Sequence, residues 1–202
     1  MKFSERGALK IGKKLVISDL HLGILGFPDF SLLDKIIEVY ERSKARTLIL
    51  NGDVKHRIGR AEIHSVERFL DDLKEHVSDL VVIKGNHDSG LEGLDYVFEN
   101  GTLILHGHKR VDEFFEAKRV IVGHAHPAIF IKDKVGGIKE RVWMIGRDGK
   151  REIIVMPAFN ELCSSTAVNL EKPVGFVFKY CRKFDVFTID GFYVGTVDFY
   201  NE

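Results

Sequence analysis

The stretch LVISDLHLG (residues 15–23) decides the fold, because it joins a hydrophobic run to a pair of metal-binding side chains. The run from Leu15 to Ser18 is continuous and does not alternate with polar residues, which is typical of a strand covered on both faces of an α/β sheet. In the Asp19-Leu20-His21 segment that follows, Asp19 and His21 can reach one cation while Leu20 points into the core. The sequence therefore predicts a buried strand that ends at a metal.

The same arrangement recurs four more times along the chain. Each further apolar run is followed at once by polar side chains that bind metals, and ligands of α/β sheets bind at the carboxyl ends of the strands. We therefore expect all these segments to meet at one site. Glycines stand where strand becomes loop, where the backbone must turn sharply or pass close to the metals. The segments are Asn51-Gly52-Asp53, Gly85-Asn86-His87-Asp88, His106-Gly107-His108 and Gly123-His124-Ala125-His126, after runs 47–50, 80–84, 102–105 and 119–122.

The elements around these runs indicate an α/β first half and a hairpin-rich second half. Amphipathic helices are expected over Phe30 to Ser43 and Ile63 to His76, so the first three strands should pair in parallel. Glycines at 136, 137, 149 and 191 mark turns between later strands. These strands are expected at 129–132, 138–145, 152–156, 184–189 and 192–199. We expect one domain, residues 1–202, with two packed sheets and helices outside.

Composition and charge limit the classes of protein. The chain has 202 residues, 45% of them hydrophobic, with 30 basic and 30 acidic side chains. A net charge of zero gives no sequence-wide attraction to nucleic acid. The start of the chain lacks the apolar region of a signal peptide, so we expect a soluble, cytoplasmic protein. A metal site could use Cys163 and Cys181, but they lack Cys-x-x-Cys spacing, so they are interpreted as ordinary thiols in a reducing cytoplasm.

The mixture of imidazole, carboxylate and amide oxygen favours Mn²⁺, Fe or Zn²⁺ over Ca²⁺. Asp53 has two carboxylate oxygens and can bridge two cations. Two cations about 3.5–4 Å apart can hold a bridging hydroxide and grip a phosphoryl oxygen together. Since a metal-bound water can have a pKa near about 7, no protein base is required. His87 is suited to proton donation near neutral pH.

The five segments resemble the motifs of the calcineurin-like metallophosphoesterases, and the match runs from Asp19 to His126. The resemblance implies an α/β fold, a four-layer αββα sandwich of two mixed β-sheets flanked by helices. It also implies two divalent cations, with Mn²⁺ expected and Fe, Zn²⁺ or Ni²⁺ as alternatives. Asp53 would bridge, and His87, oriented by Asp88, would stabilise or protonate the leaving oxygen. The implied ligands are Asp19, His21 and His126 for the first cation, and Asn86, His106 and His124 for the second.

Within that superfamily the chain is most similar to the DNA-ligase-associated phosphoesterases, a subgroup tied to DNA repair. This similarity includes the late Pro157-Ala158-Phe159-Asn160, whereas Ile24 stands where the subgroup tends to have Lys. His108 and His56 are candidate phosphate contacts, and His108 is also an alternative to His106 as ligand. The remaining histidines and Arg57 and Arg60 are interpreted as surface or loop residues.

Three functions follow from this resemblance. The first is hydrolysis of phosphodiesters in nucleotides or nucleic acid. Lys132, Lys134, Lys139 and Arg141 could form a basic hairpin surface for it, although a solvated strand face is the favoured interpretation of these residues. The second is hydrolysis of a small nucleotide or another small phosphate ester. The third is a scaffold that keeps the fold without catalysis, which the complete ligand set disfavours. The sequence leaves the oligomeric state open.

Overall fold

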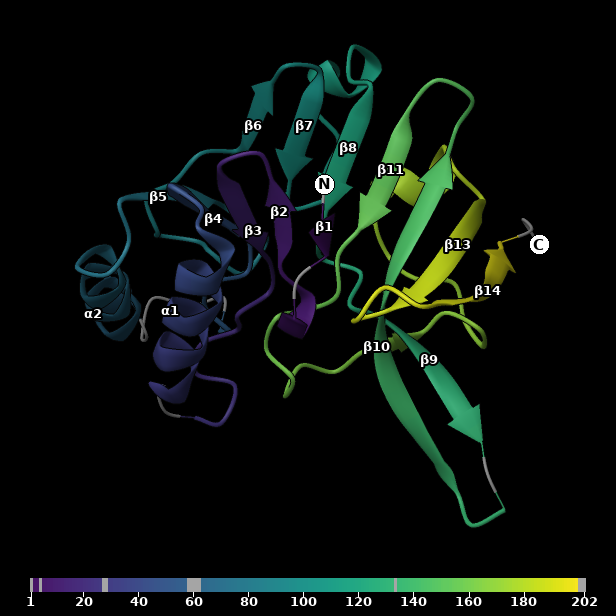
Figure 1. The fold of residues 1–202 in the computed structure, drawn as a ribbon, viewed down its shortest axis with the longest axis horizontal. Coiled ribbons are helices and arrows are strands. Elements are labelled where there is room, and N and C mark those ends of the chain that lie inside the picture. Colours follow the sequence, from purple (N-terminus) through teal and green to yellow (C-terminus); the bar gives the residue numbers. More distant parts are fainter. Residues whose placement is uncertain (1, 4, 27–28, 58–62, 133, 200–202) are drawn as a thin grey trace.

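The computed structural model describes residues 2–3, 5–26, 29–57, 63–132 and 134–199, and its first sheet has five strands in the order β1-β2-β3-β4-β5. β3, β4 and β5 pair in parallel, and β1 and β2 extend the sheet with antiparallel pairing. Helices α1 and α2 connect the parallel strands and lie on one side of the sheet (Figure 1). The bounds are β1 Lys2–Phe3, β2 Leu9–Ile11, β3 Lys14–Ile17, α1 Ser31–Ser43, β4 Thr47–Asn51, α2 Ile63–Lys74 and β5 Asp79–Ile83.

The second sheet has nine strands, and its central path runs β12-β9-β10-β11-β8-β7-β6. β7, β8 and β11 are parallel neighbours, and β13 and β14 form a hairpin that pairs with β10. The bounds are β6 Tyr96–Glu99, β7 Thr102–Leu105, β8 Arg119–Val122, β9 Pro127–Lys132, β10 Gly137–Arg147, β11 Glu152–Val155, β12 Thr166–Ala167, β13 Lys183–Thr188 and β14 Tyr193–Asp198. Short 3-10 helices cover Glu5–Gly7, Asp112–Phe115 and Phe176–Lys179.

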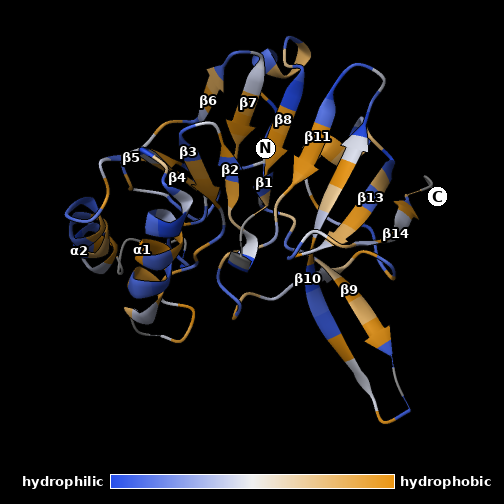
Figure 2. Cartoon of the chain, viewed as in Figure 1, coloured by the Kyte–Doolittle hydropathy of each residue, from blue (hydrophilic) through white to orange (hydrophobic). Residues whose placement is uncertain are grey.

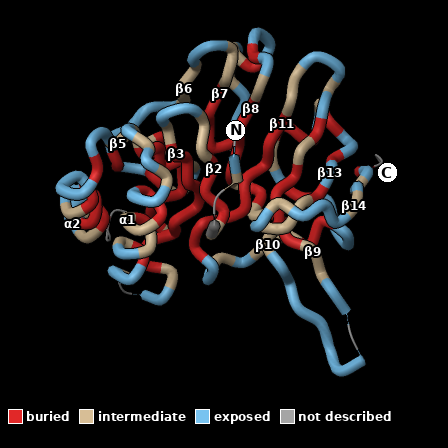
Figure 3. Tube along the Cα trace, in the orientation of Figure 1, coloured by how far each residue is buried: buried red, intermediate tan, exposed pale blue. Residues whose placement is uncertain are grey.

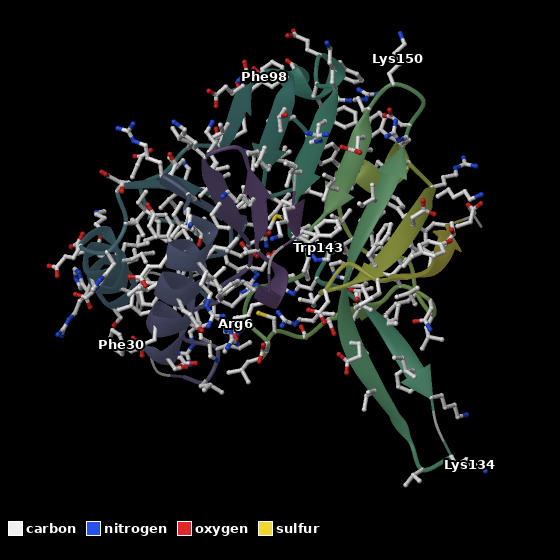
Figure 4. The ribbon with its side chains drawn as sticks, viewed as in Figure 1. Arg6, Phe30, Phe98, Lys134, Trp143 and Lys150 are labelled. Atoms are coloured by element: carbon white, nitrogen blue, oxygen red, sulfur yellow. The ribbon has the colours of Figure 1, made fainter. Side chains whose placement is uncertain are left out.

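The two sheets pack face to face, which explains why the strands are apolar on both sides. Along β3, Leu15 and Ile17 pack under the helices, whereas Val16 faces the other sheet. The central core joins residues of both sheets, and Trp143 of β10 lies within it, stacked on Phe3 at 4.7 Å between ring centroids (Figure 4). Figure 2 shows the apolar character of these strands, and Figure 3 shows that they are buried.

The predicted fold class is confirmed, and the predicted parallel strands agree with the structure to within a residue or two. The outer layers differ in kind. Two α-helices cover the first sheet, but the outer face of the second packs against 3-10 segments that contribute Phe114, Phe176 and Phe178. Sequence patterns did not indicate β1, β2, β6 and β12, which are two to four residues long.

One hairpin extends away from the body of the molecule. We name residues 127–141 the hairpin arm; it contains β9 and the first half of β10 (Figure 1). The second half of β10 pairs with β11 and β13 inside the sandwich. Lys134 lies at the tip of the arm (Figure 4), and Val135 beside it is 97% exposed. The arm therefore begins directly after His126, one of the predicted ligands.

Candidate metal centre

The carboxyl ends of the strands bring the predicted metal-binding side chains together, as their spacing predicted. Among the described residues, three sets of ligand atoms could each hold a metal ion, and the atoms within each set lie within 4.8 Å of one another. Asp53, His106 and His124 form one set, whereas Asp19, His21 and Asp53 form another. Asp53 belongs to both, which is the position required of a bridging ligand. The third set is His21, His126 and Cys163.

Short distances join these sets into one cluster. His126 Nε2 lies 3.0 Å from Asp19 Oδ1 and 3.3 Å from His21 Nε2. His106 Nε2 lies 3.2 Å from Asp53 Oδ2. Asp19, His21, Asp53 and His106 are all buried. The cluster opens into a cleft of about 180 Å³ that is lined by His21, Ile24, Asp53, His56, Asn86, His87, His124, His126, Cys163 and Ser164.

Backbone hydrogen bonds between the loops fix this arrangement. The N–H of Asp19 donates to the Gly52 carbonyl (3.1 Å), and the N–H of His21 donates to the Asp53 carbonyl (2.9 Å). The N–H of His124, from the second sheet, donates to the Asp19 carboxylate at 3.1 Å. The loops of the two sheets are therefore tied to each other at the carboxylate itself.

Most predicted ligands have an unusual backbone conformation. A positive φ is uncommon outside glycine, although Asn, Asp and His adopt it several times more often than other residues. Such a conformation costs of order 1–3 kcal/mol and persists where the surrounding structure imposes it. In this site the strain turns successive side chains toward one point. The residues concerned are Asp19 (φ 60°), His21 (46°), Asp53 (50°), His124 (67°) and His126 (42°).

Three glycines of the predicted segments, Gly52, Gly85 and Gly123, lie where no Cβ fits. A Cβ on Gly52 would lie 2.3 Å from His106 Nδ1, and one on Gly85 would lie 2.1 Å from Asp53 Oδ1. At Gly123 it would lie 1.8 Å from the Ser18 hydroxyl oxygen. Each glycine thus lets another segment place a polar group in the site.

The electrostatics of the cluster favour a cation. Burial opposes ionisation of Asp19, yet His126 and His106 outweigh it and hold the pKa of this carboxyl well below its usual range. Burial also opposes protonation of His106, but the Asp53 and Asp19 carboxylates raise its pKa to about 9. Two buried carboxylates thus require positive charge nearby, because an uncompensated buried charge is very costly.

His106 and His126 each direct Nε2 into the cluster, toward a carboxylate. His106 Nδ1 donates to the Asn51 carbonyl (3.1 Å) and His126 Nδ1 to the Ser164 carbonyl (2.9 Å), which leaves each Nε2 as the ligand atom. His106 Nε2 is buried and faces Asp53 Oδ2 at 3.2 Å, but within the described part of the chain no partner meets it with hydrogen-bond geometry. Burial lowers the pKa values of His21 and His124 to about 4, so both are neutral and can coordinate. The residues therefore fit a metal centre.

The other predicted site residues lie around this cluster. Asn86 lines the cleft but is exposed at its rim, unlike the other predicted ligands. His87 is half-buried. Its backbone N–H donates to Asp53 Oδ1 (2.9 Å), and its ring Nδ1 forms a hydrogen bond with the His56 carbonyl. Asp88 accepts backbone N–H groups from Lys55 (3.1 Å) and Gly85 (2.8 Å), so it holds the loop in place.

The two candidate phosphate contacts are placed differently. His56 lines the cleft, and its ring packs at 5.4 Å from the His21 ring between centroids. His108 lies 5.5 Å from the His106 ring and lines a neighbouring cavity of about 340 Å³. His64, His76 and Arg57 are exposed, as interpreted from the sequence, and Arg60 lies outside the described residues. Glu161 forms an ion pair with Arg141 at 3.1 Å.

Cys163 is the site residue that sequence patterns missed. It lies in a loop after β11, follows no strand directly and belongs to none of the five motifs. The only available signal was the preceding Pro157-Ala158-Phe159-Asn160, which hydrogen bonds to the first motif. The Phe159 N–H donates to the Ser18 carbonyl and the Asn160 amide donates to the Leu20 carbonyl, both at 2.8 Å.

Comparisons with known proteins identify the class. The family model described as calcineurin-like phosphoesterase matches residues 12–127, so the chain belongs to that family. No curated protein shows a significant sequence match to the chain.

None of the helices in the described residues has the length and apolar character to cross a membrane.

Among solved structures similar to the chain at low identity, a nuclease shares its fold. The nuclease MPE from Pseudomonas putida is 17% identical, with 94% of this chain and 92% of that chain covered and a TM-score of 0.64. A Vps29 mutant from Entamoeba histolytica is 15% identical (93% and 99% covered, TM-score 0.45). A predicted phosphoesterase from Streptococcus pneumoniae is 20% identical (92% and 95% covered, TM-score 0.43).

Proposed function

We propose that the chain is a phosphodiesterase that hydrolyses nucleotide or nucleic-acid phosphodiester bonds with two divalent cations. The observation that carries this proposal is the convergence of buried Asp19, Asp53 and His106 with three further histidines at one cleft. Asp19, His21 and His126 would hold the first cation, and Asn86, His106 and His124 the second, with Asp53 between them. The bound cations would supply an activated water and neutralise charge on the phosphoryl group.

His87 is assigned the role of stabilising or protonating the leaving oxygen. It lies at the cleft, and its Nε2 is 4.0 Å from Asp53 Oδ2, beside the proposed cations. Its Nδ1 is bonded to the His56 carbonyl, so Nε2 is the nitrogen available to the substrate. Asp88 and His56 position His87. Asp88 holds the backbone of the loop, and the His56 carbonyl fixes the orientation of the His87 imidazole. His108 remains a candidate phosphate contact on the side of the second cation.

Mn²⁺ is the expected cation, with Fe, Zn²⁺ or Ni²⁺ as alternatives, and the cytoplasm is the expected compartment. A link to DNA repair rests on the resemblance to the DNA-ligase-associated subgroup. The likeness of the fold to that of the nuclease MPE supports a nucleic-acid substrate for this chain. A small nucleotide is the second candidate, since the cleft measures only about 180 Å³ and the net charge is zero.

The decisive experiment measures metal content and hydrolysis of a bis-aryl phosphate with Mn²⁺. We expect two equivalents of metal and turnover that Asp53→Asn abolishes, because the variant loses the shared carboxylate. Asn tolerates the φ of 50° at this position, so the variant should stay folded. Asp71→Asn, on the exposed face of α2, is the matched control and should be fully active. Wild-type protein that binds metal without hydrolysing any ester would support a scaffold instead.

A substrate panel separates the two enzyme hypotheses. Single- and double-stranded DNA, RNA, cyclic nucleotides and monoesters are compared with Mn²⁺ at several salt concentrations. Hydrolysis of DNA or RNA that weakens as salt rises is expected for a nucleic-acid substrate. Hydrolysis restricted to mono-aryl phosphates would contradict the phosphodiesterase assignment.

A further inference from the structure

The sulfur of Cys163 lies close to the ligand nitrogens of two proposed metal ligands. Its Sγ lies within 4.8 Å of ligand nitrogens of both His21 and His126, and the three together form a set that could hold a metal ion. The residue is half-buried and lines the same cleft as Asp53 and His87. Its side chain is therefore part of the wall around the first cation position.

The loop that carries Cys163 is fixed to the site at several points. The Asn160 side chain is buried; its amide donates to the Leu20 carbonyl (2.8 Å), and the Cys163 N–H donates to the Asn160 carbonyl (3.2 Å). Ser164 accepts the Nδ1–H of His126 through its carbonyl (2.9 Å). The same short loop thus orients a histidine ligand and brings the sulfur to it.

We propose that Cys163 is a thiolate ligand of the cation held by Asp19, His21 and His126, and that it biases this position toward Zn²⁺, Co²⁺ or Fe²⁺ relative to Mn²⁺. The thiol releases its proton to solvent as the sulfur–metal bond forms. Thiolate is a soft ligand that favours Zn²⁺, and Fe²⁺ and Co²⁺ bind a given site more tightly than Mn²⁺, which is suited to carboxylate, carbonyl and water. The inference rests on the proposed function, because it assumes that the cluster binds cations.

A purely structural thiol is the competing explanation. The Cys163 thiol donates one weak hydrogen bond, to the Asp19 carbonyl oxygen at 3.6 Å. Cys181 shows what a structural thiol looks like in this chain. It is 2% exposed, and its Sγ lies 3.3 Å from the Lys183 carbonyl and 3.5 Å from the Arg147 carbonyl, away from the site's ligand sets. It is therefore the matched control.

The test is the absorption spectrum of the Co²⁺-loaded protein. We expect a near-ultraviolet sulfur-to-cobalt charge-transfer band in the wild type and in Cys181→Ser, and its loss in Cys163→Ser. Competition between Zn²⁺ and Mn²⁺, read as bound metal, should show Zn²⁺ preference falling by about 10–100-fold in Cys163→Ser only. Wild-type protein that binds Co²⁺ without the sulfur band would overturn the proposal and leave the proposed function intact.

A second measurement needs no variant. Iodoacetamide is applied to native wild-type protein, and alkylation of each cysteine is followed by mass spectrometry with and without Zn²⁺. Zn²⁺ should slow alkylation of Cys163 and leave Cys181 unchanged. Equal alkylation of Cys163 in both conditions, with Zn²⁺ bound, would refute ligation. Wild-type protein that binds no cation of any kind would instead remove the proposed function together with this inference.

Discussion

At the scale of single residues, the chemistry depends on side chains that tolerate a left-handed backbone. Asp19, His21, Asp53, His124 and His126 all have φ between 42° and 67°. Asp and His are residue types that both bind cations and adopt this conformation, so ligand identity and backbone shape reinforce each other. Their convergence could be predicted from the sequence because each lies within four residues of the end of an apolar run.

Replacing His87 with Ala tests the proposed role of this residue, which is to stabilise or protonate the leaving oxygen. We expect both cations to remain bound, because the His87 contact to Asp53 Oδ1 comes from its backbone N–H. Turnover should fall by about 10²–10⁴-fold, the usual effect of losing a general acid. His64→Ala is the control, since the His64 side chain is fully exposed on α2. Unchanged turnover on a diester with a poor leaving group would refute the assignment.

At the scale of elements, continuous apolar runs predicted strands well because each strand is buried on both faces. Ile49 of β4 packs between the sheets, while Leu48 and Leu50 pack under α1 and α2. Strands β1 and β12, of two residues each, carry no such run. Their extended conformation depends on pairing with β2 and β9, respectively. Cys163 could not be predicted for a related reason. Its loop is held in position by the side-chain amide of Asn160, a contact between segments that are distant in sequence.

A substitution at Gly52 tests whether the turn after β4 shapes the metal site. Gly52 and Gly149 have nearly the same backbone, with φ of 83° and 86°, but only Gly52 faces another side chain, His106. Alanine at either position costs roughly 1–2 kcal/mol of strain. At Gly52 we expect a further loss of about 1–3 kcal/mol from overpacking and loss of one cation.

Urea unfolding and metal analysis of Gly52→Ala and Gly149→Ala provide the comparison. Gly149 has open space within 4 Å of an added Cβ, so its variant reports backbone strain alone. Equal destabilisation of the two variants with full metal content in both would show that the Gly52–His106 approach has no consequence for the site.

At the scale of the whole molecule, the chain consists of two sheets whose loops meet at the site and an arm that leaves it. The arm, residues 127–141, has four basic and two acidic residues, and it starts at the residue after His126. Its outer part is exposed (Figure 3). Hydropathy patterns predicted the hairpin but could not predict that it projects, because projection depends on where β10 leaves its neighbours β11 and β13.

Lysines of the arm test the nucleic-acid hypothesis. If the arm contacts phosphates, the double variant Lys132→Ala with Lys134→Ala should bind double-stranded DNA with a weaker salt dependence. The slope of log affinity against log salt should fall in magnitude by about two. Hydrolysis of a bis-aryl phosphate should stay unchanged. The control pair is Lys118→Ala with Lys150→Ala, and Lys150 lies at the opposite end of the sheet (Figure 4). An equal salt dependence in both pairs would exclude the arm as a DNA contact.

The left-handed backbone at the proposed cation-binding positions also limits how such a protein can drift during evolution. Val, Ile and Thr are strongly disfavoured there, whereas Asn, Asp, His and Gly are tolerated. A lineage can exchange Asp53 for Asn with little effect on its architecture and still lose its hold on cations. Inactive descendants should therefore be one substitution away, and they should keep small amide or glycine residues at these positions long after catalysis has disappeared.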